Sequence, residues 1–276
     1  MSQGHATSNP QEYQLPSGAR IAALARIKVV MIRTSLAANI GSAARAMKTM
    51  GLSQLSLVSP KSFPDPDASA LASGADDILH NACVFPSLDA ALADTHFVIG
   101  SSAQRRELKM PELNPAQAAR RLVEQAELGP VAIVFGTERS GMENSELERC
   151  HYLSVIPTDQ VFSSLNVAQA IQLYCYEIRC AALSIRRDDP HHQLISALGE
   201  TLTERPAPAA ELEGFFDHLQ TTLAELEFLD LQNPRQMMRR LRRLFLRARP
   251  ESTEIHLLRG ILAALGKKAR AMASRR

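Results

Sequence analysis

Short apolar runs alternate with helix-forming stretches along the first two thirds of the chain. The runs are bounded by polar residues, Gly or Pro, as buried strands are. The stretches between them have a 3.6-residue apolar period or are rich in Ala, Leu and Glu. This alternation predicts an α/β fold, with a largely parallel sheet and helices on both faces. The predicted strands are Ile27–Ile32, Leu55–Val58, Phe97–Ile99, Val131–Phe135 and Leu153–Ile156, and the predicted helices are Ile40–Met50, Ser87–Ala93, Pro115–Glu127 and Leu165–Ile185.

Local signals set the expected ends of these elements. We expect Asn39 to cap the first helix through its side-chain oxygen, and Gly51 to adopt a left-handed conformation just beyond that helix. Ser163 or Ser164 is suited to capping the long helix that follows them. Residues 60–67 hold three prolines and two aspartates, which predicts a surface loop.

The pattern changes after Ile185. A length of 276 residues suggests about two domains. The stretch over residues 186–209 is weakly periodic and holds Pro190, Pro206 and Pro208, so we interpret it as a linker. The polar residues 1–20 are expected to form a disordered tail. These boundaries predict an α/β domain over residues 21–185 and a small all-helical domain over residues 210–276, with helices at Ala210–Leu229, Arg235–Arg247 and Ser252–Ala273.

Positive charge is concentrated at the C-terminal end. The net charge is only +2, but residues 235–276 hold 13 Lys and Arg against two Glu, which leaves −9 for the rest of the chain. Clustered cations attract phosphates, so a polyanionic partner is indicated. The helix Arg235–Arg247 is amphipathic and basic, and Arg239 and Arg243 are candidate RNA contacts. A solvated helix face remains an alternative, as does a membrane surface.

Other sequence signals mainly exclude classes. No run of 18 apolar residues and no signal-like stretch is present, so we expect a cytoplasmic protein without membrane attachment. Phosphate-binding Walker, GxGxxG and HExxH motifs are absent. The cysteines show no CxxC spacing, so we expect reduced buried thiols and no metal site; they are Cys83, Cys150, Cys175 and Cys180.

Small residues follow three of the predicted strands, where ligands of open α/β sheets bind. After the first strand, Gly41 and Arg45 share one helix face, so Gly41 is expected to leave room for an anion that Arg45 can grip. A surface arginine on an Ala-rich helix is the alternative. The turns at Gly100–Ala103 and Gly136–Gly141 would let backbone groups approach a flat ligand such as adenine. There, Glu138 and Arg139 either pair or face the substrate.

Three ordered motifs make this combination specific. They are Asn39-x-Gly41-x-x-x-Arg45, Val134-Phe-Gly136-x-Glu138-x-x-Gly141 and Ser164-Leu165-Asn166. Together they resemble the motifs of the SPOUT ribose methyltransferases. Other segments resemble the bacterial TrmJ-type tRNA methyltransferases. They are the helix ending at Gly51 and the tail segments Leu241–Ser252 and Leu258–Leu262, so that the similarity extends over residues 27–267.

The resemblance implies a C-terminal trefoil knot in the sheet, S-adenosyl-L-methionine bound in the knot, and a homodimer in which Arg45 faces the other chain's cofactor. It implies 2'-O-methylation of a C or U ribose at nucleotide 32 of the tRNA anticodon loop. Arg45 and Ser164 would be catalytic, and Asn39 and Arg139 would bind substrate. The cofactor would contact Ser101, Ser102, Ala103, Gly136, Ile156, Ser163, Ser164, Leu165 and Asn166.

The chemistry favours Arg45 as a group that orients the ribose and stabilises the developing alkoxide. A guanidinium with a pKa above about 12 is a poor base at neutral pH, although proton removal by Arg45 itself is the family's usual alternative. The tail over residues 210–276 would dock tRNA. One rival, a non-catalytic RNA-binding module, leaves the three motifs unexplained. Another is a related knotted enzyme that acts on a base or on another RNA.

Overall fold

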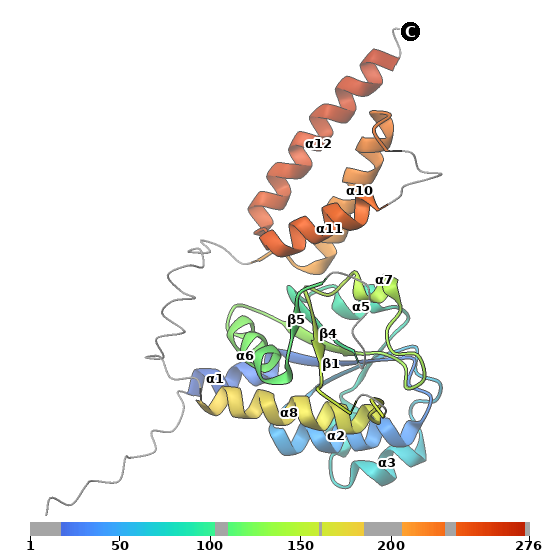
Figure 1. Ribbon diagram of the computed structural model, residues 1–276, viewed down its shortest axis with the longest axis vertical. Helices are drawn as coiled ribbons and strands as arrows, with labels where there is room; N and C mark the ends of the chain where they lie inside the picture. Colours follow the sequence, from blue (N-terminus) through green and yellow to red (C-terminus); the bar gives the residue numbers. More distant parts are fainter. Residues whose placement is uncertain (1–17, 103–109, 160–161, 185–205, 230–235, 274–276) are drawn as a thin grey trace, which may run out of the picture.

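The computed structural model describes residues 18–102, 110–159, 162–184, 206–229 and 236–273. They form an α/β domain and a helical domain that lies against one side of it (Figure 1). The α/β domain is built on one seven-stranded sheet in the order β3-β2-β1-β6-β4-β7-β5, and every pair of neighbours is parallel. The strands are β1 Ile27–Ile32, β2 Gln54–Val58, β3 Cys83–Phe85, β4 Phe97–Ser102, β5 Glu112–Leu113, β6 Val131–Phe135 and β7 Tyr152–Val155.

The predicted parallel α/β architecture is confirmed, with five expected strands at the centre of the sheet. The two strands that the pattern missed, β3 and β5, are the edge strands. They hold only three and two residues and are partly exposed, so that the apolar Cys83–Phe85 is too short to stand out and Glu112–Leu113 forms no run. Strand β4 runs to Ser102, beyond its predicted end, because Gly100 and Ser101 continue the pairing with β6 and β7.

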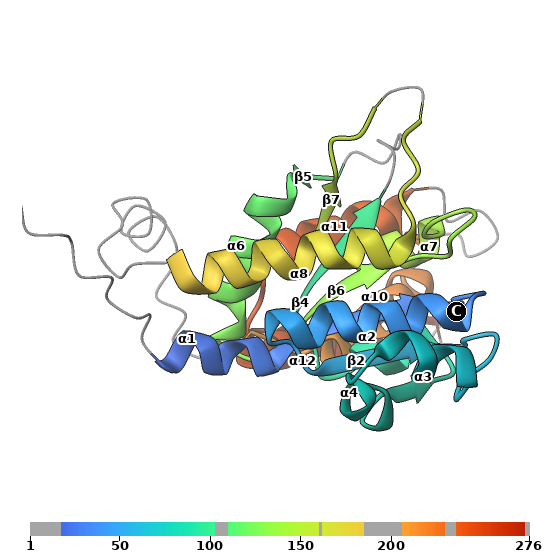
Figure 2. The same ribbon diagram turned by 90° about the horizontal axis from the view of Figure 1, so that it is seen from below.

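Helices cover both faces of the sheet. Alternate residues of β1 point to opposite faces, so that Val29 packs with the larger helical layer and Val30 with the smaller one. The larger layer holds α1, α2, α3, α4, α6 and α8, and the smaller holds α5 and α7; α2 and α8 run side by side in Figure 2. Their bounds are α1 Gly18–Ala23, α2 Ala37–Met50, α3 Pro66–Ala72, α4 Asp76–His80, α5 Leu88–Leu92, α6 Pro115–Ala126, α7 Asn144–Leu147 and α8 Val167–Ser184, with a 3-10 turn at Leu24–Arg26.

Helix α2 corrects two expectations. It begins at Ala37, with Leu36 at the capping position, so that Asn39 lies inside the helix and does not cap it. Gly51 takes the expected left-handed conformation, with a φ of 82°. Gly41 does not leave room for a ligand, because a Cβ built there would lie 2.0 Å from the carbonyl oxygen of Ala68 in α3. The glycine therefore permits close packing of α2 on α3.

Two boundaries also differ from those expected, and a third lies largely outside the described residues. Helix α3 begins at Pro66, with Asp65 accepting a hydrogen bond from the Asp67 N–H, so that the expected loop over residues 60–67 ends inside a helix. The expected tail over residues 1–20 overlaps α1: Arg20 is buried and pairs with Glu127 at 3.0 Å, whereas residues 1–17 lie outside the described part. Most of the expected linker over residues 186–209, namely residues 186–205, is likewise outside it.

The helical domain has the three expected helices, α10 Ala209–Glu225, α11 Met237–Ala248 and α12 Ser252–Ala273. Phe215 and Phe216 of α10 pack with Phe245 of α11 at its centre. The backbone N–H of Ala209 donates to the carbonyl of Thr95 at 2.9 Å and so ties the domain to the α5 side of the sheet. Helix α11 lies between the α10–α12 pair and the sheet (Figure 1).

The cysteines are free thiols, and their burial matches the expectation only in part. Cys150 and Cys175 are buried, and burial raises the pKa of both thiols to about 12. Cys180 is half-buried, and Cys83 is exposed because it lies on the edge strand β3. A buried environment was therefore the wrong expectation for Cys83.

Candidate functional site

A cavity of about 280 Å³ lies where β4, β6 and β7 end. The carboxyl edge of a parallel sheet is where ligands of open α/β folds bind. Three segments far apart in the sequence meet there: the end of β4, the turn after β6, and the stretch between β7 and α8. Its lining residues are Ser101, Ser102, Phe135, Gly136, Thr137, Glu138, Arg139, Ser140, Gly141, Ile156, Thr158, Ser163, Ser164, Leu165, Val167 and Ala170.

The predicted cofactor residues gather in this cavity. Seven of them line it: Ser101, Ser102, Gly136, Ile156, Ser163, Ser164 and Leu165. Ala103 lies outside the described residues, and Asn166 sits behind the lining at the start of α8. Arg139, predicted to bind substrate, also lines the cavity, and its guanidinium has no hydrogen-bond or ion-pair partner among the described residues. It is not paired with Glu138, so that one of the two alternatives for this turn is excluded.

The turn after β6 folds back tightly on itself. Thr137 and Gly141 exchange backbone hydrogen bonds of 3.1 and 2.9 Å, and Gly141 has a φ of 67°. A Cβ on Gly136 would lie 2.2 Å from the carbonyl carbon of Gly141. Gly136 is therefore needed because the closed turn leaves no room for a side chain at this position. The sequence had suggested a different reason, the close approach of a ligand to the backbone.

Glu138 connects this turn to α2. Its carboxylate accepts hydrogen bonds from the backbone N–H groups of Ser35 and Leu36, at 3.1 and 3.4 Å, and from Nδ2 of Asn39 at 3.0 Å. Burial acts to raise the pKa of Glu138, but these donors outweigh burial and hold the pKa below its ordinary value. Glu138 is therefore an ionised group that fixes the start of α2 to the cavity.

Asn39 extends the connection to α8. Its Oδ1 accepts a hydrogen bond of 2.9 Å from Nδ2 of Asn166, whose own Oδ1 accepts the backbone N–H of Ala168 at 2.9 Å. Asn166 therefore caps α8, and neither Ser163 nor Ser164 does, contrary to expectation. Asn39 is buried with both ends of its amide engaged, so we assign it a positioning role in place of substrate contact. We call Glu138, Asn39 and Asn166 the amide relay.

Ser164 is left exposed at the cavity, where its hydroxyl can meet a ligand. The preceding residue is held through its backbone, because Thr158 Oγ1 donates to the carbonyl of Ser163 at 3.2 Å. These two residues lie on the short segment between β7 and the capped start of α8. The relay and Thr158 thus fix the segment that carries Ser164.

Arg45 projects from α2 into solvent and does not line the cavity of its own chain. Among the described residues its guanidinium has no hydrogen-bond or ion-pair partner, and only its backbone carbonyl accepts a bond, from Thr49. An exposed and unpaired arginine is available to a second molecule. The two predicted catalytic residues, Arg45 and Ser164, therefore do not meet at the cavity of one chain. They can meet only if a second chain contributes Arg45.

Sequence reasoning missed a hydroxyl pair behind the cavity. Tyr174 of α8 is fully buried and donates to Ser154 Oγ at 2.8 Å, and Ser154 donates to the Leu113 carbonyl at 3.2 Å. Burial raises the pKa of Tyr174 above its ordinary value, so that its hydroxyl stays protonated. The signal in the sequence was a tyrosine on the apolar face of α8, since a buried phenol needs a partner.

The two arginines proposed for RNA contact differ in their surroundings. Arg239 forms an ion pair of 2.6 Å with Glu148, just after α7, so part of its charge is used within the chain. Arg243 lines a large groove between α11 and the sheet. Of the two arginines, Arg243 alone is therefore unpaired among the described residues and available to RNA, whereas the sequence suggested this for both.

The cavity suits an adenosine-like ligand better than a metal ion. Ile156, Leu165 and Val167 give it apolar walls for a flat ring, while Thr137 and Ser164 offer hydroxyls. Across the described ranges, no group of three His, Cys, Asp or Glu side chains is placed to hold a metal. No described helix is long and apolar enough to cross a bilayer.

Comparisons with known proteins agree with this architecture. The family model "SpoU rRNA Methylase family" matches residues 26–176, and the model "tRNA methyltransferase TrmJ, C-terminal domain" matches residues 210–274. The tRNA (cytidine/uridine-2'-O-)-methyltransferase TrmJ of Pectobacterium atrosepticum is 45% identical over 246 residues, which cover 88% of this chain and 98% of that protein. The TrmJ of Photorhabdus laumondii is 45% identical over 247 residues, covering 90% and 99%.

Two solved structures are similar over both domains. TrmJ from Z. mobilis has a TM-score of 0.72 at 35% identity, covering 86% of this chain and 98% of that one. A probable methylase family protein from Haemophilus influenzae has a TM-score of 0.55 at 40% identity, covering 90% and 99%. With its α/β domain matched by one family model and its helical domain by the other, the chain belongs to the SpoU methylase family and carries the TrmJ C-terminal domain.

Proposed function

We propose that this protein transfers a methyl group from S-adenosyl-L-methionine to the ribose 2'-oxygen of a cytidine or uridine in tRNA, at nucleotide 32 of the anticodon loop. One observation carries the proposal: seven residues predicted for the cofactor, from three separate segments, line a single cavity at the carboxyl edge of the sheet. The likeness to TrmJ proteins over about nine tenths of the chain supports tRNA as the substrate and the ribose as the acceptor.

The cavity is the proposed cofactor site. Its volume of about 280 Å³ is near the lower end of the roughly 300–1,000 Å³ that small-molecule sites span. Bound there, the cofactor would supply an electrophilic methyl group on a sulfonium. Ser101 and Ser102, at the end of β4, and the Gly136 turn would hold it largely through backbone groups, while Ile156 and Leu165 exclude water from it.

The active site is proposed to form between two copies of the chain. Arg45 is exposed and remote from its own cavity, whereas α8, which packs beside α2, presents an apolar stripe to solvent. Leu173, Tyr176 and Leu183 of this stripe are 42, 52 and 41% exposed and lie at helical spacing on one face. Pairing of two such faces would bury the stripes and bring the partner copy's α2 toward the cavity.

The chain's own groups then have separate tasks. The guanidinium of Arg45 orients the ribose and stabilises negative charge as it develops on the 2'-oxygen. Because a guanidinium is a poor base, water accepts the proton late in the transfer. Ser164 donates a hydrogen bond to the ribose or the cofactor, and the amide relay holds the segment that carries Ser164. The helical domain contacts the RNA backbone.

A cytoplasmic location and a trefoil knot in the sheet complete the proposal. The knot is inferred from membership of the family, and the location from the tRNA substrate. The knot would account for a cavity that is lined by segments as distant as Ser101 and Ser164.

Mass spectrometry of nucleosides and of ribonuclease fragments of tRNA, from a strain that lacks the gene, tests the product and its position. We expect 2'-O-methylcytidine and 2'-O-methyluridine to disappear from position 32 and to return with the wild-type gene but not with an Arg45→Ala gene. Unchanged methylation at position 32, with loss of a methyl group elsewhere, would refute the proposed site. Analytical ultracentrifugation tests the dimer, and Tyr176→Glu should make the protein monomeric and inactive.

A further inference from the structure

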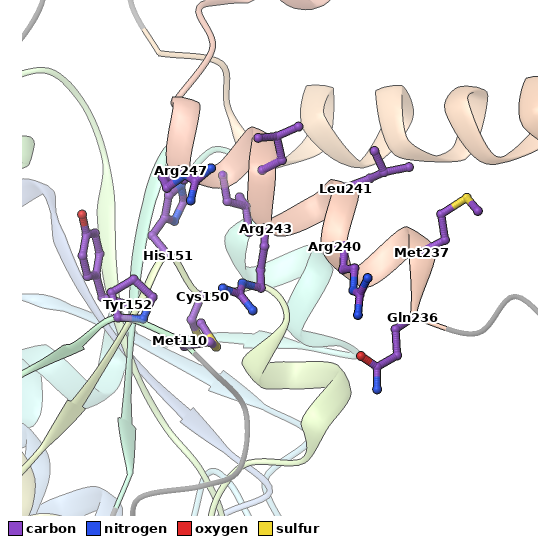
Figure 3. A pocket seen from close by; sticks show the side chains of 13 residues that line it. Met110, Cys150, His151, Tyr152, Gln236, Met237, Arg240, Leu241, Arg243 and Arg247 are labelled. Carbon is purple, nitrogen blue, oxygen red and sulfur yellow. The ribbon is translucent and has the colours of Figure 1, made fainter.

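The groove under α11 has a volume of about 1,220 Å³. One wall is α11 of the helical domain. The other is formed by Met110 and Pro111, just before β5, and by residues 150–152, at the start of β7. Figure 3 shows Arg240 and Arg243 on the side of α11 that looks toward Met110, Cys150 and Tyr152. The groove therefore lies between the two domains, in neither alone.

The arginines of α11 fall into two groups. Arg242 pairs bidentately with Glu213, and Arg239 pairs with Glu148 at 2.6 Å. Arg240, Arg243 and Arg247 are exposed, have no such partner among the described residues, and line the groove. Their spacing of three and four residues places them on one face of the helix. Two arginines of α11 are thus paired, Arg242 within the helical domain and Arg239 with the α/β domain, and three others are left unpaired among the described residues.

The charge of the groove is uncompensated. No Asp or Glu is among the lining residues described. His151, on the opposite wall, adds no positive charge at neutral pH, because burial lowers its pKa to about 3. The cavity on the other side of α11 differs, since Asp89, Glu148 and Glu213 line it together with its cations. Of these two cavities, the groove has the net positive lining among the described residues.

The other lining groups favour a nucleic acid over a simple anion. Met110, Leu241 and Leu244 give the groove an apolar surface, and Tyr152 adds an aromatic ring with Arg121 over it, 4.9 Å from the centroid. Apolar and aromatic surface beside a row of arginines accommodates bases next to phosphates. The volume is several times that of the cofactor cavity, so that it can admit more than one nucleotide.

We infer that this interdomain groove is the site where the protein grips the RNA backbone, with Arg240, Arg243 and Arg247 each contacting a phosphate. The inference rests on the proposed tRNA substrate and deepens it. Strand β7 connects the groove to the active site, because Tyr152 lines the groove and Ile156 lines the cofactor cavity. Four residues of strand span about 13 Å. Arg239 and Arg242 are then positioning residues that hold α11 over the groove.

A triple substitution, Arg240→Gln, Arg243→Gln and Arg247→Gln, tests the inference by binding to an unmodified tRNA transcript at several salt concentrations. Each lost phosphate contact removes about 0.7–0.9 from the slope of log K against log salt. The slope should become shallower by about 2 to 3. Between about 50 and about 200 mM salt, the variant should lose about 20- to 40-fold less affinity than the wild type. Substituting the same three residues with Lys should preserve the slope.

The matched control removes three exposed cations from α12 of the same domain, by Arg259→Gln, Lys267→Gln and Lys268→Gln. It should leave the slope within about half a unit of the wild type, since diffuse charge makes no phosphate contact. An unchanged slope in the groove variant, or an equal loss in the control, would overturn the inference. If the wild type itself transfers no methyl group to tRNA, the proposed function fails; if it does and the groove variant keeps the wild-type KM for tRNA, only the groove assignment fails.

Discussion

Replacement of Asn39 by alanine tests whether the amide relay holds the active site together. The change removes the bond from Asn39 to the Glu138 carboxylate and the bond that Asn39 accepts from Asn166, of 3.0 and 2.9 Å. A hydrogen bond to a charged group contributes about 1.5–3 kcal/mol, and a neutral one about 0.5–1.5 kcal/mol. Alanine recovers up to about 0.7 kcal/mol through its higher helix propensity. The free energy of unfolding should therefore fall by about 1.3–3.8 kcal/mol.

Urea unfolding at pH 7 measures this loss, and the midpoint should shift without a change in slope. Thr49→Ala is the control, because Thr49 is exposed on the same helix, and its effect should stay within about 0.5 kcal/mol. Calorimetry with S-adenosylmethionine should show about fivefold weaker binding for Asn39→Ala, which corresponds to about 1 kcal/mol lost at the segment held by Asn166.

A second substitution gives the reasoning a pH signature. Asn39→Asp preserves the size of the side chain but sets a second carboxylate against Glu138, so that it should destabilise more at pH 7 than near pH 4.5. The wild type shows the opposite pH dependence at this site. Folding lowers the pKa of Glu138, so the stability that its ionised form contributes is lost as the pH falls below the ordinary pKa of a glutamate. If Asn39→Ala behaves like Thr49→Ala in both stability and cofactor binding, the relay has no structural role.

Three further predictions follow from the site and the core. Arg45→Ala should abolish methyl transfer while changing cofactor affinity less than about twofold in calorimetry, and equal loss of both would contradict its separate role. Gly136→Val should prevent cofactor binding, because even a Cβ would lie 2.2 Å from Gly141, and retained affinity would show that the turn can open. Burial, with Arg249 nearby, lowers the pKa of His96 to about 4 and of His151 to about 3. These histidines take up protons at a higher pH in the unfolded chain than in the folded protein. The free energy of unfolding should therefore fall as the pH drops from about 6.5 to about 4. The urea midpoint should follow this fall, and His96→Gln should make it shallower; an equally steep fall in that variant would contradict the assignment.

The sequence predicted those parts of the fold that depend on burial. Strand β6 is apolar along its whole length and β1 at every position except Lys28, so their runs were evident. The edge strands β3 and β5 were missed because they are short: Cys83–Phe85 is apolar but holds three residues, Glu112–Leu113 holds two, and pairing with a neighbour defines both. The start of α2 was misplaced for a related reason: its first turn is held by Glu138, about a hundred residues away, and no local capping residue marks it.

The candidate site was predictable in its composition but not in its contacts. The order of the three motifs was enough to gather Gly136 and Ser164 at one cavity. The role of Asn39 was not evident, because an amide at the start of a helix most often caps it, whereas here the side chain bridges Glu138 and Asn166. Likewise, the basic helix α11 was recognised from its charge, but which arginines are paired depends on acids in other elements, such as Glu148 and Glu213.

Methyl transfer from labelled S-adenosylmethionine to synthetic tRNA tests the central claim most directly. Two tRNAs would be compared that differ only in carrying a ribose or a 2'-deoxyribose at nucleotide 32. The wild-type protein should label the first and leave the second unlabelled, whereas the Arg45→Ala protein should label neither. Equal labelling of both tRNAs by the wild type would show that the acceptor is not the 2'-oxygen of that nucleotide, and would contradict the assignment.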